Sequence, residues 1–251
     1  MSQIAVACLV FVCCIAAALT GLLIKLPGRH IDGDSKETVR LVMGLIATMA
    51  ALVLGLLIGS ANSSYDTQAA ELQQMCADVA QLDRMLVLYG PETRDIRDIL
   101  RQAVTVAHER IWPSEGNAPP NLDPSLGQKQ IDLFYAKLQS LAPKSDAQTR
   151  AQNTAWQLAS TLTQVRMLMY EQLGQSVSWY LLAVLTFWVS VLFLGFGLFA
   201  RCHVTLLITL GVGAISVAGA VFLILELTQP YSGFIRLSDA PVRSALASMN
   251  P

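Results

Sequence analysis

The sequence predicts an all-α membrane protein with four transmembrane helices and a four-helix soluble bundle between helices two and three. Three observations predict this fold. The chain is 53% hydrophobic and only 14% charged, whereas about a quarter of the residues of a soluble domain are charged. Four uncharged runs are long enough to cross the roughly 30 Å hydrocarbon core of a bilayer. The polar stretch between the second and third runs carries apolar residues at helical spacing.

The four uncharged runs are Ile4–Ile24, Leu41–Ala61, Val177–Ala200 and Val204–Leu225. The first run could also be a signal peptide. No Lys or Arg precedes it, however, and it exceeds the roughly 7–15 apolar residues of such peptides, so we count it as a membrane helix. The expected divisions are helices one and two in residues 1–61, the bundle in 62–174, helices three and four in 175–227, and a membrane- or bundle-associated tail in 228–251.

The second run has one face of small residues that becomes polar toward its end. The face consists of Thr48, Ala51, Gly55, Gly59, Asn62 and Asp66, at spacings of three and four, with Ser63 beside it. Lipid gives helices no hydrophobic reason to associate, so small residues mark the places where another backbone can approach closely. Two interpretations stay open: a helix-packing face, or the lining of a narrow pore at the axis of a ring of copies.

The polar stretch predicts four amphipathic helices. The first continues the second run to about Leu88 and stops at Gly90-Pro91, a pair typical of a helix end. A second helix is expected at about Glu92–Ile111, ending at Trp112-Pro113, and residues 113–126 are rich in turn formers. A third helix places Phe134 on its apolar face, and Ser145 is a good N-cap for the fourth.

No catalytic, metal or cofactor motif is found, so we expect neither an enzyme nor a cofactor. The three histidines, His30, His108 and His203, are dispersed, and no zinc spacing or phosphate-binding loop is present. We expect His108 on a solvated helix face and the charges of residues 94–98 in weak surface pairs. Glu226, at the end of the fourth run, is expected to be a snorkelling or paired interfacial acid rather than an ion-pathway group. The net charge of −1 makes nucleic acid an unexpected partner.

The charges near the runs give a small preference for which side the bundle faces. Five basic residues, Lys25, Arg29, Lys36, Arg40 and Arg201, lie in the two short connectors, against three, Arg166, Arg236 and Arg243, on the bundle side. Connectors rich in Lys and Arg stay in the cytoplasm, which favours an external bundle.

Several segments resemble a known family over nearly the whole chain. They are residues 39–66, Leu82–Arg101, Trp112-Pro113, Phe196–Ala200 and Leu223–Pro241, in that order. In these segments the chain resembles the bestrophin-like DUF4239 family of bacterial membrane proteins, remotely related to the bestrophin anion channels. The resemblance implies a four-span subunit, assembled as a ring that we expect to be a pentamer, around an anion pore lined by the second helix. It also implies a cytosolic bundle, opposite to the charge count.

Two functions are therefore weighed. The first is an oligomeric channel that conducts small anions past the small face of the second helix, although Asp66 at the mouth favours cations. The second is a membrane-anchored sensory or interaction protein whose bundle binds a partner or ligand. The expected partners are the lipid bilayer, further copies of the chain and small inorganic ions, and the expected location is the bacterial inner membrane.

Overall fold

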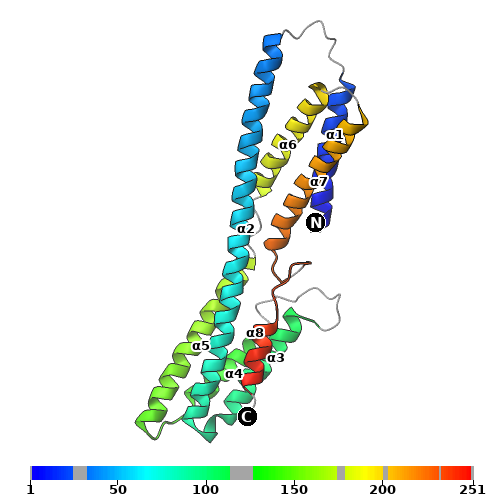
Figure 1. Cartoon of the computed structure of the whole chain (residues 1–251). Coiled ribbons are helices and arrows are strands. Elements are labelled where there is room, and N and C mark those ends of the chain that lie inside the picture. The colour runs from blue at the N-terminus through cyan, green and yellow to red at the C-terminus, as the bar shows by residue number, and fades with distance from the viewer. Residues whose placement is uncertain are drawn as a thin grey trace. The chain divides into compact units, whose positions relative to one another are not determined.

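The computed structural model describes residues 2–24, 33–113, 127–173, 179–199, 203–231 and 233–249. Within these ranges the elements are all helical: α1 (Gln3–Leu23), α2 (Gly33–Tyr89), the 3-10 helix η1 (Pro91–Thr93), α3 (Arg94–Ile111), α4 (Gln128–Gln139), α5 (Asp146–Leu173), α6 (Trp179–Phe199), α7 (Val204–Leu227) and α8 (Ala240–Ser248) (Figure 1). The expected turns at residues 25–32, 114–126 and 201–202 lie outside the described residues.

The chain divides into two compact units. The first comprises Met1–Tyr65 and Ser176–Thr228, and the second comprises Asp66–Gln175 and Gln229–Pro251. The helix α2 contributes residues to both units. Each unit has its own packing, and they are described in turn.

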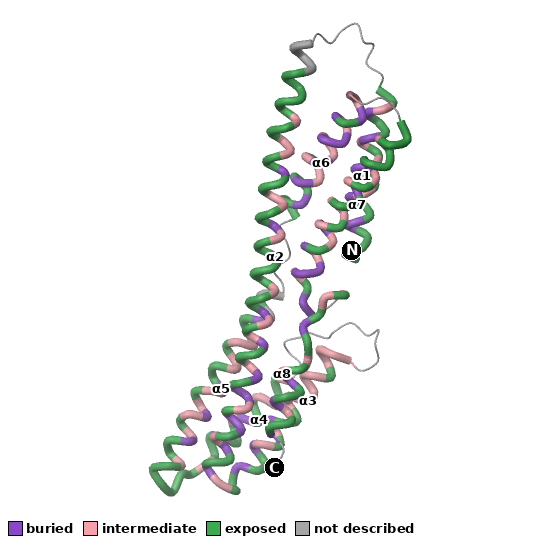
Figure 2. The backbone as a smooth tube through the Cα atoms, in the orientation of Figure 1, coloured by how far each residue is buried: buried purple, intermediate pink, exposed green. Residues whose placement is uncertain are grey.

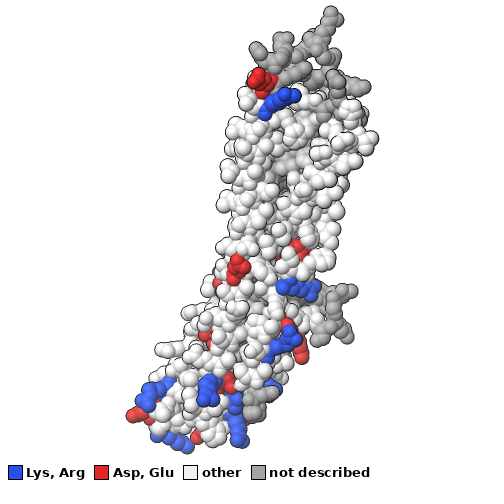
Figure 3. Space-filling view, viewed as in Figure 1, with Lys and Arg blue, Asp and Glu red and all other residues white. Residues whose placement is uncertain are grey.

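The first unit contains the apolar helices. Among the described residues, four helices are long and apolar enough to cross a membrane: α1, α2 from Glu37 onward, α6 and α7. On the face in Figure 3, the region of α1, α6, α7 and the first half of α2 is almost entirely uncharged, and the charged side chains lie near the ends of this apolar region. The prediction of an all-α protein with four long apolar helices is confirmed.

Helices α1 and α6 approach each other at two glycines. A Cβ atom on Gly21 of α1 would collide with the carbonyl oxygen of Leu194 and would lie 2.9 Å from the backbone nitrogen of Leu198. A Cβ atom on Gly197 of α6 would collide with the carbonyl oxygen of Ala18. These neighbours are backbone atoms, which cannot rotate away, so glycine is required at both positions. Small residues thus provide the close backbone approach that stabilises helix pairs in lipid.

The fourth apolar helix differs from expectation in its contacts. From the sequence we expect Gly211, Gly213, Gly219 and Ala220 of α7 to be helix contact points. A Cβ built on Gly213 lies 3.4 Å from the ring of Phe193, but nothing in the chain lies within 4 Å of a Cβ built on Gly211 or Gly219. The prediction is therefore wrong within the single chain for Gly211 and Gly219. The side that packs inward carries Ala214 and Ile224 instead, both with no exposed surface. Leu210 and Val221 are buried on α7 as well, so apolar side chains of different sizes fill the inward side.

The second unit has a hydrophobic core to which five segments contribute. Its buried residues come from α2, α3, α4, α5 and the end of α8, where Met249 closes the core: Val79, Leu82, Leu86, Ile96, Leu100, Phe134, Leu138, Ala155, Ala159 and Met249. Figure 2 shows the buried positions recurring along one side of each helix. The C-terminal segment is therefore part of this core.

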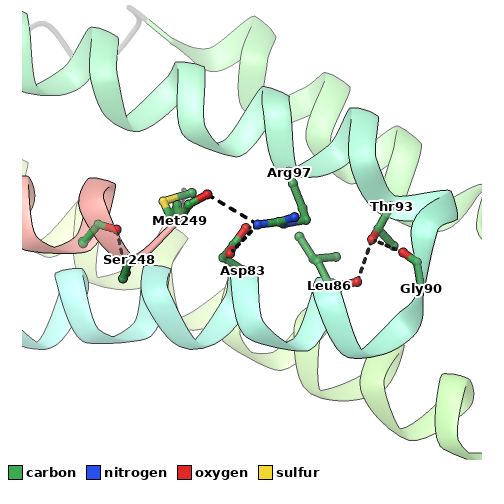
Figure 4. Close-up of polar contacts among 8 residues, drawn as sticks. Asp83, Leu86, Gly90, Thr93, Arg97, Ser248 and Met249 are labelled. Carbon is green, nitrogen blue, oxygen red and sulfur yellow. Dashed lines mark hydrogen bonds and ion pairs between the residues drawn. The ribbon is translucent and has the colours of Figure 1, made fainter. Parts of the chain in front are cut away.

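The turn between α2 and α3 is held by one buried threonine. Gly90 adopts φ 132°, a backbone conformation that favours glycine, and Pro91 begins η1. The Thr93 hydroxyl donates to the carbonyl oxygen of Leu86 at 2.6 Å, and its oxygen also lies 2.8 Å from the carbonyl of Gly90 (Figure 4). These contacts cap the carboxyl end of α2, as Gly90-Pro91 predicted.

Replacing Gly21 or Gly197 with leucine should separate α1 from α6. Overpacking of this kind costs about 1–3 kcal/mol or more, because the obstructing atoms belong to the backbone. We expect the midpoint of thermal unfolding, measured by tryptophan fluorescence in detergent, to fall by about 5 °C or more. Gly211→Leu is the matched control, since a Cβ there meets nothing in the chain. Equal shifts for the control and the two variants would contradict this packing.

Candidate functional site

The small face of α2 points away from the rest of its own chain. Its residues are all exposed: Thr48, Ala51, Gly55, Gly59, Asn62, Ser63 and Asp66. Nothing lies within 4 Å of a Cβ built on Gly55 or Gly59. The buried face of the same segment carries Ala50, Leu57 and Ala61. At about 100° per residue, these two faces lie on nearly opposite sides of the helix.

The uncovered side of α2 is itself divided into a small part and a large apolar part. Leu41, Leu45, Leu52 and Leu56 are 61–75% exposed and lie next to the small residues around the helix. Long aliphatic side chains suit lipid, whereas the small residues leave room for a backbone or for water. The uncovered surface of α2 thus has one part with long apolar side chains, which suits lipid, and one part with small and polar side chains.

Glu226 near the carboxyl end of α7 is fully buried. The side chain therefore does not extend to water as a snorkelling acid would. Of the alternatives weighed from the sequence, a buried acid in an ion pathway or in a polar contact is compatible with this burial.

A cavity of about 200 Å³ lies inside the second unit. Its walls contain apolar side chains from α2, α3, α4, α5 and α8, among them Met75 of α2, Ile99 of α3, Ile131 and Phe134 of α4, Leu162 of α5 and Val242 of α8. His108, Arg110 and Arg166 also line it. The sequence did not predict this site, because its residues lie far apart in the chain, from Leu72 to Ala245.

The C-terminal segment is held to α3 beside this cavity. His108 Nε2 lies 3.0 Å from Asp239 Oδ2, and Trp112 Nε1 donates to the carbonyl oxygen of Leu237 at 2.9 Å. The rings of His108 and Trp112 stack with centroids 5.7 Å apart. The expectation that His108 lies on a solvated helix face is wrong, because the tail covers it. We call these contacts of His108 and Trp112 the tail clasp.

The carboxyl group of Asp239 is the titratable centre of the tail clasp. The hydrogen bond from His108 holds the pKa of Asp239 below its usual value of 3.8, and the charge of Arg243, whose Nη2 lies 2.8 Å away, acts in the same direction. Both interactions favour the ionised carboxylate. Asp239 therefore takes part in the tail clasp as an ionised carboxylate near neutral pH.

A second polar contact joins α3 to α2. Arg97 donates from Nε and Nη2 to the two carboxylate oxygens of Asp83, at 2.7 and 3.0 Å, and Nη2 also lies 3.4 Å from the carbonyl oxygen of Met249 (Figure 4). The Asp83 side chain is only 7% exposed. The expectation of weak surface pairs along residues 94–98 is wrong for Arg97, because this pair is bidentate and largely buried.

A metal centre within the described residues would need several of their titratable groups close together. Among the described residues, no three His, Cys, Asp or Glu side chains gather closely enough to hold a metal ion. The described side chains take part in packing, in ion pairs and in the lining of the cavity.

The fold and these sites define an integral membrane protein: four apolar helices of membrane-spanning length, and a helical unit with charged contacts. Comparison then identifies the family. The Bestrophin-like domain matches residues 10–242, and the chain belongs to the bestrophin-like family. This confirms the family predicted from residues 39–66 and the other resembling segments. No curated protein and no solved structure matches the chain.

The tail clasp should make stability depend on acidic pH. The pKa of Asp239 is lower in the folded protein than its usual value of 3.8, so the unfolded chain binds a proton at a higher pH than the folded protein does. The stability that the ionised carboxylate contributes is therefore lost as the pH falls through these two pKa values. We expect thermal stability to fall more steeply between about pH 5 and pH 3 for the wild type than for Asp239→Asn. Parallel curves, measured by scanning fluorimetry, would show that Asp239 contributes nothing.

Removing the guanidinium from the pair with Asp83 should destabilise the second unit. Arg97→Gln leaves a carboxylate buried without its charge partner, at a cost of about 3 kcal/mol, the lower end of the range for buried pairs. Arg94→Gln, at an exposed position on the same helix, should change stability by less than about 0.5 kcal/mol. Denaturant titration followed by circular dichroism measures both. If the two variants lost equal stability, the pair would be energetically unimportant.

Proposed function

We propose that the chain is a subunit of an oligomeric channel that conducts small ions, with small anions the expected substrate. The observation that carries this proposal is the small face of α2, which is uncovered by its own chain and lies opposite the buried face. A ring of copies, expected to be a pentamer, would place this face at its axis. Membership of the bestrophin-like family supports the proposal, since the family resemblance implies an anion pore lined by the second helix.

The polarity of the small face also favours a wet environment. Asn62 and Ser63 are exposed polar residues that follow directly on the apolar segment, and Asp66 lies one turn farther on. Polar side chains in contact with hydrocarbon are costly, whereas a water-filled lumen solvates them. The constriction at Gly55 and Gly59 would then be apolar and narrow, a form that can close by dewetting.

The sign of the selectivity depends on which groups face the lumen. No Lys or Arg interrupts the four uncharged runs, so anion preference would have to come from hydroxyl groups such as that of Thr48, from helix ends and from the connectors. The Asp66 carboxylate acts in the opposite direction. In the same proposal, the polar half of α2 forms with α3, α4 and α5 the soluble bundle between spans two and three.

Ion flux from liposomes tests the channel. We expect the wild type to release anions down a gradient and Gly55→Trp and Gly59→Trp to abolish the flux, because each indole fills the narrow lumen. Leu56→Trp is the matched control: it adds the same ring one residue away, on the leucine side of α2, and should leave most of the flux.

Each variant must keep the oligomeric size of the wild type. No flux of any ion from an intact wild-type ring would disprove conduction. Equal loss in the control would place the pore elsewhere.

A sensory or interaction protein is the second candidate, and one observation favours it. A basic or aromatic ligand site in the bundle is the feature that would distinguish it from a simple channel. The cavity of the second unit is lined by Trp112, Tyr135 and Arg110, among others. A protein with this site and no ion flux would support the second candidate.

A further inference from the structure

The walls of the cavity in the second unit suit a hydrocarbon chain. They are formed mainly by aliphatic and aromatic side chains, such as Met75, Ile99 and Phe134. Water in a protein interior needs two to four polar partners, which such walls do not offer. Ligand sites in proteins typically combine apolar walls with a few polar groups that orient the ligand.

The volume of the cavity sets the size of the hydrocarbon. A cavity of about 150 Å³ with aliphatic walls can hold a benzene molecule, with six carbon atoms. This cavity measures about 200 Å³ and is partly open. A chain of roughly eight to ten carbon atoms fits that space, with its polar end at the opening.

The polar groups of the lining favour an anionic end. Tyr135 and Thr163 bond to each other, with their oxygens 2.9 Å apart, and His108 is engaged by Asp239. Arg110 donates its Nε–H to the carbonyl oxygen of Val106, while its Nη2 lies beside Gly127, 3.2 Å from the position of a Cβ there.

Arg166 is a second guanidinium in the lining, and the described lining residues include no Asp or Glu. The cavity therefore has basic groups among apolar walls.

We propose that this cavity binds a medium-chain fatty acid, with its hydrocarbon among the walls of α2–α5 and α8 and its carboxylate on the guanidinium of Arg110. The size of the cavity selects the chain length and the basic lining selects the head group. Carboxylates form charge-assisted, bidentate hydrogen bonds with arginine, which suits this assignment. The binding does not depend on whether the chain conducts ions.

Photo-crosslinking in lipid nanodiscs tests the site with the full-length protein. A decanoate analogue carrying a diazirine should label peptides of α3, α4 and α5, and unlabelled decanoate should compete. From hexanoate to decanoate, the competing affinity should rise about fourfold per added methylene, the gain expected from burying each one. It should stop rising once the chain outgrows the cavity.

Two variants with matched controls test the wall and the head group. Ala107→Leu fills part of the cavity and should weaken decanoate at least tenfold, whereas Gln102→Leu, an exposed position on α3 outside the lining, should not. Arg110→Gln should lower the affinity for decanoate about tenfold or more, which is the effect of losing a hydrogen bond to a charged group. It should leave the affinity for decanol unchanged. Arg101→Gln, exposed on the same helix, should affect neither.

Labelling that follows lipid partition, spread over α1, α6 and α7 and unchanged by Ala107→Leu, would overturn the site. If decanol bound as tightly as decanoate, and Arg110→Gln left the affinity for decanoate unchanged, the assignment of the carboxylate to Arg110 would be overturned. Because neither readout measures ion flux, failure of this proposal is distinguishable from failure of the channel.

Discussion

The backbone contact at Gly21 and Gly197 is the constraint on which the first unit depends. In a bilayer the solvent is as apolar as the side chains, so helices associate only where their atoms pack more closely with each other than with lipid. At both glycines the atom that occupies the place of a missing Cβ is a carbonyl oxygen of the other helix. The position of α1 against α6 is therefore fixed by two residues without side chains, and α7 packs beside α1 (Figure 1).

The same reasoning distinguishes the small face of α2 from these contacts. Glycine within a helix costs about 1 kcal/mol relative to alanine, and that cost is offset where a close backbone contact follows. Gly21 and Gly197 have such a contact within the chain, whereas Gly44, Gly55 and Gly59 have none. A second copy of the chain or a narrow aqueous lumen meeting that face would account for the glycines of α2 that have no contact within the chain, and this is why α2 supports the proposal of a channel.

The helices could be predicted from the sequence because their signals are local. The sequence predicts that the fourth uncharged run begins at Val204, and α7 begins at that residue. It predicts that the helix before Gly90-Pro91 ends at about Leu88, and α2 ends at Tyr89. Which glycines meet could not be predicted, since Gly211 and Gly21 have similar apolar surroundings and only the arrangement of the helices separates them. His108 shows the same limit: the charged residues Glu109 and Arg110 follow it in the sequence, and its partner Asp239 lies 131 residues away. The cavity was missed for this reason too.

In the second unit, polar contacts determine where the C-terminal segment lies. Arg97 reaches the carbonyl of Met249, and the tail clasp holds Leu237 and Asp239 against α3. Between these two attachments lies α8, whose Val242 and Ala245 form part of the cavity wall. A ligand that needs this wall binds only when the tail is in place, so its binding free energy adds to the stability of the tail clasp. In the proposal of a bound fatty acid, occupancy of the cavity and attachment of the C-terminal segment would therefore be thermodynamically coupled, and each would strengthen the other by the same amount.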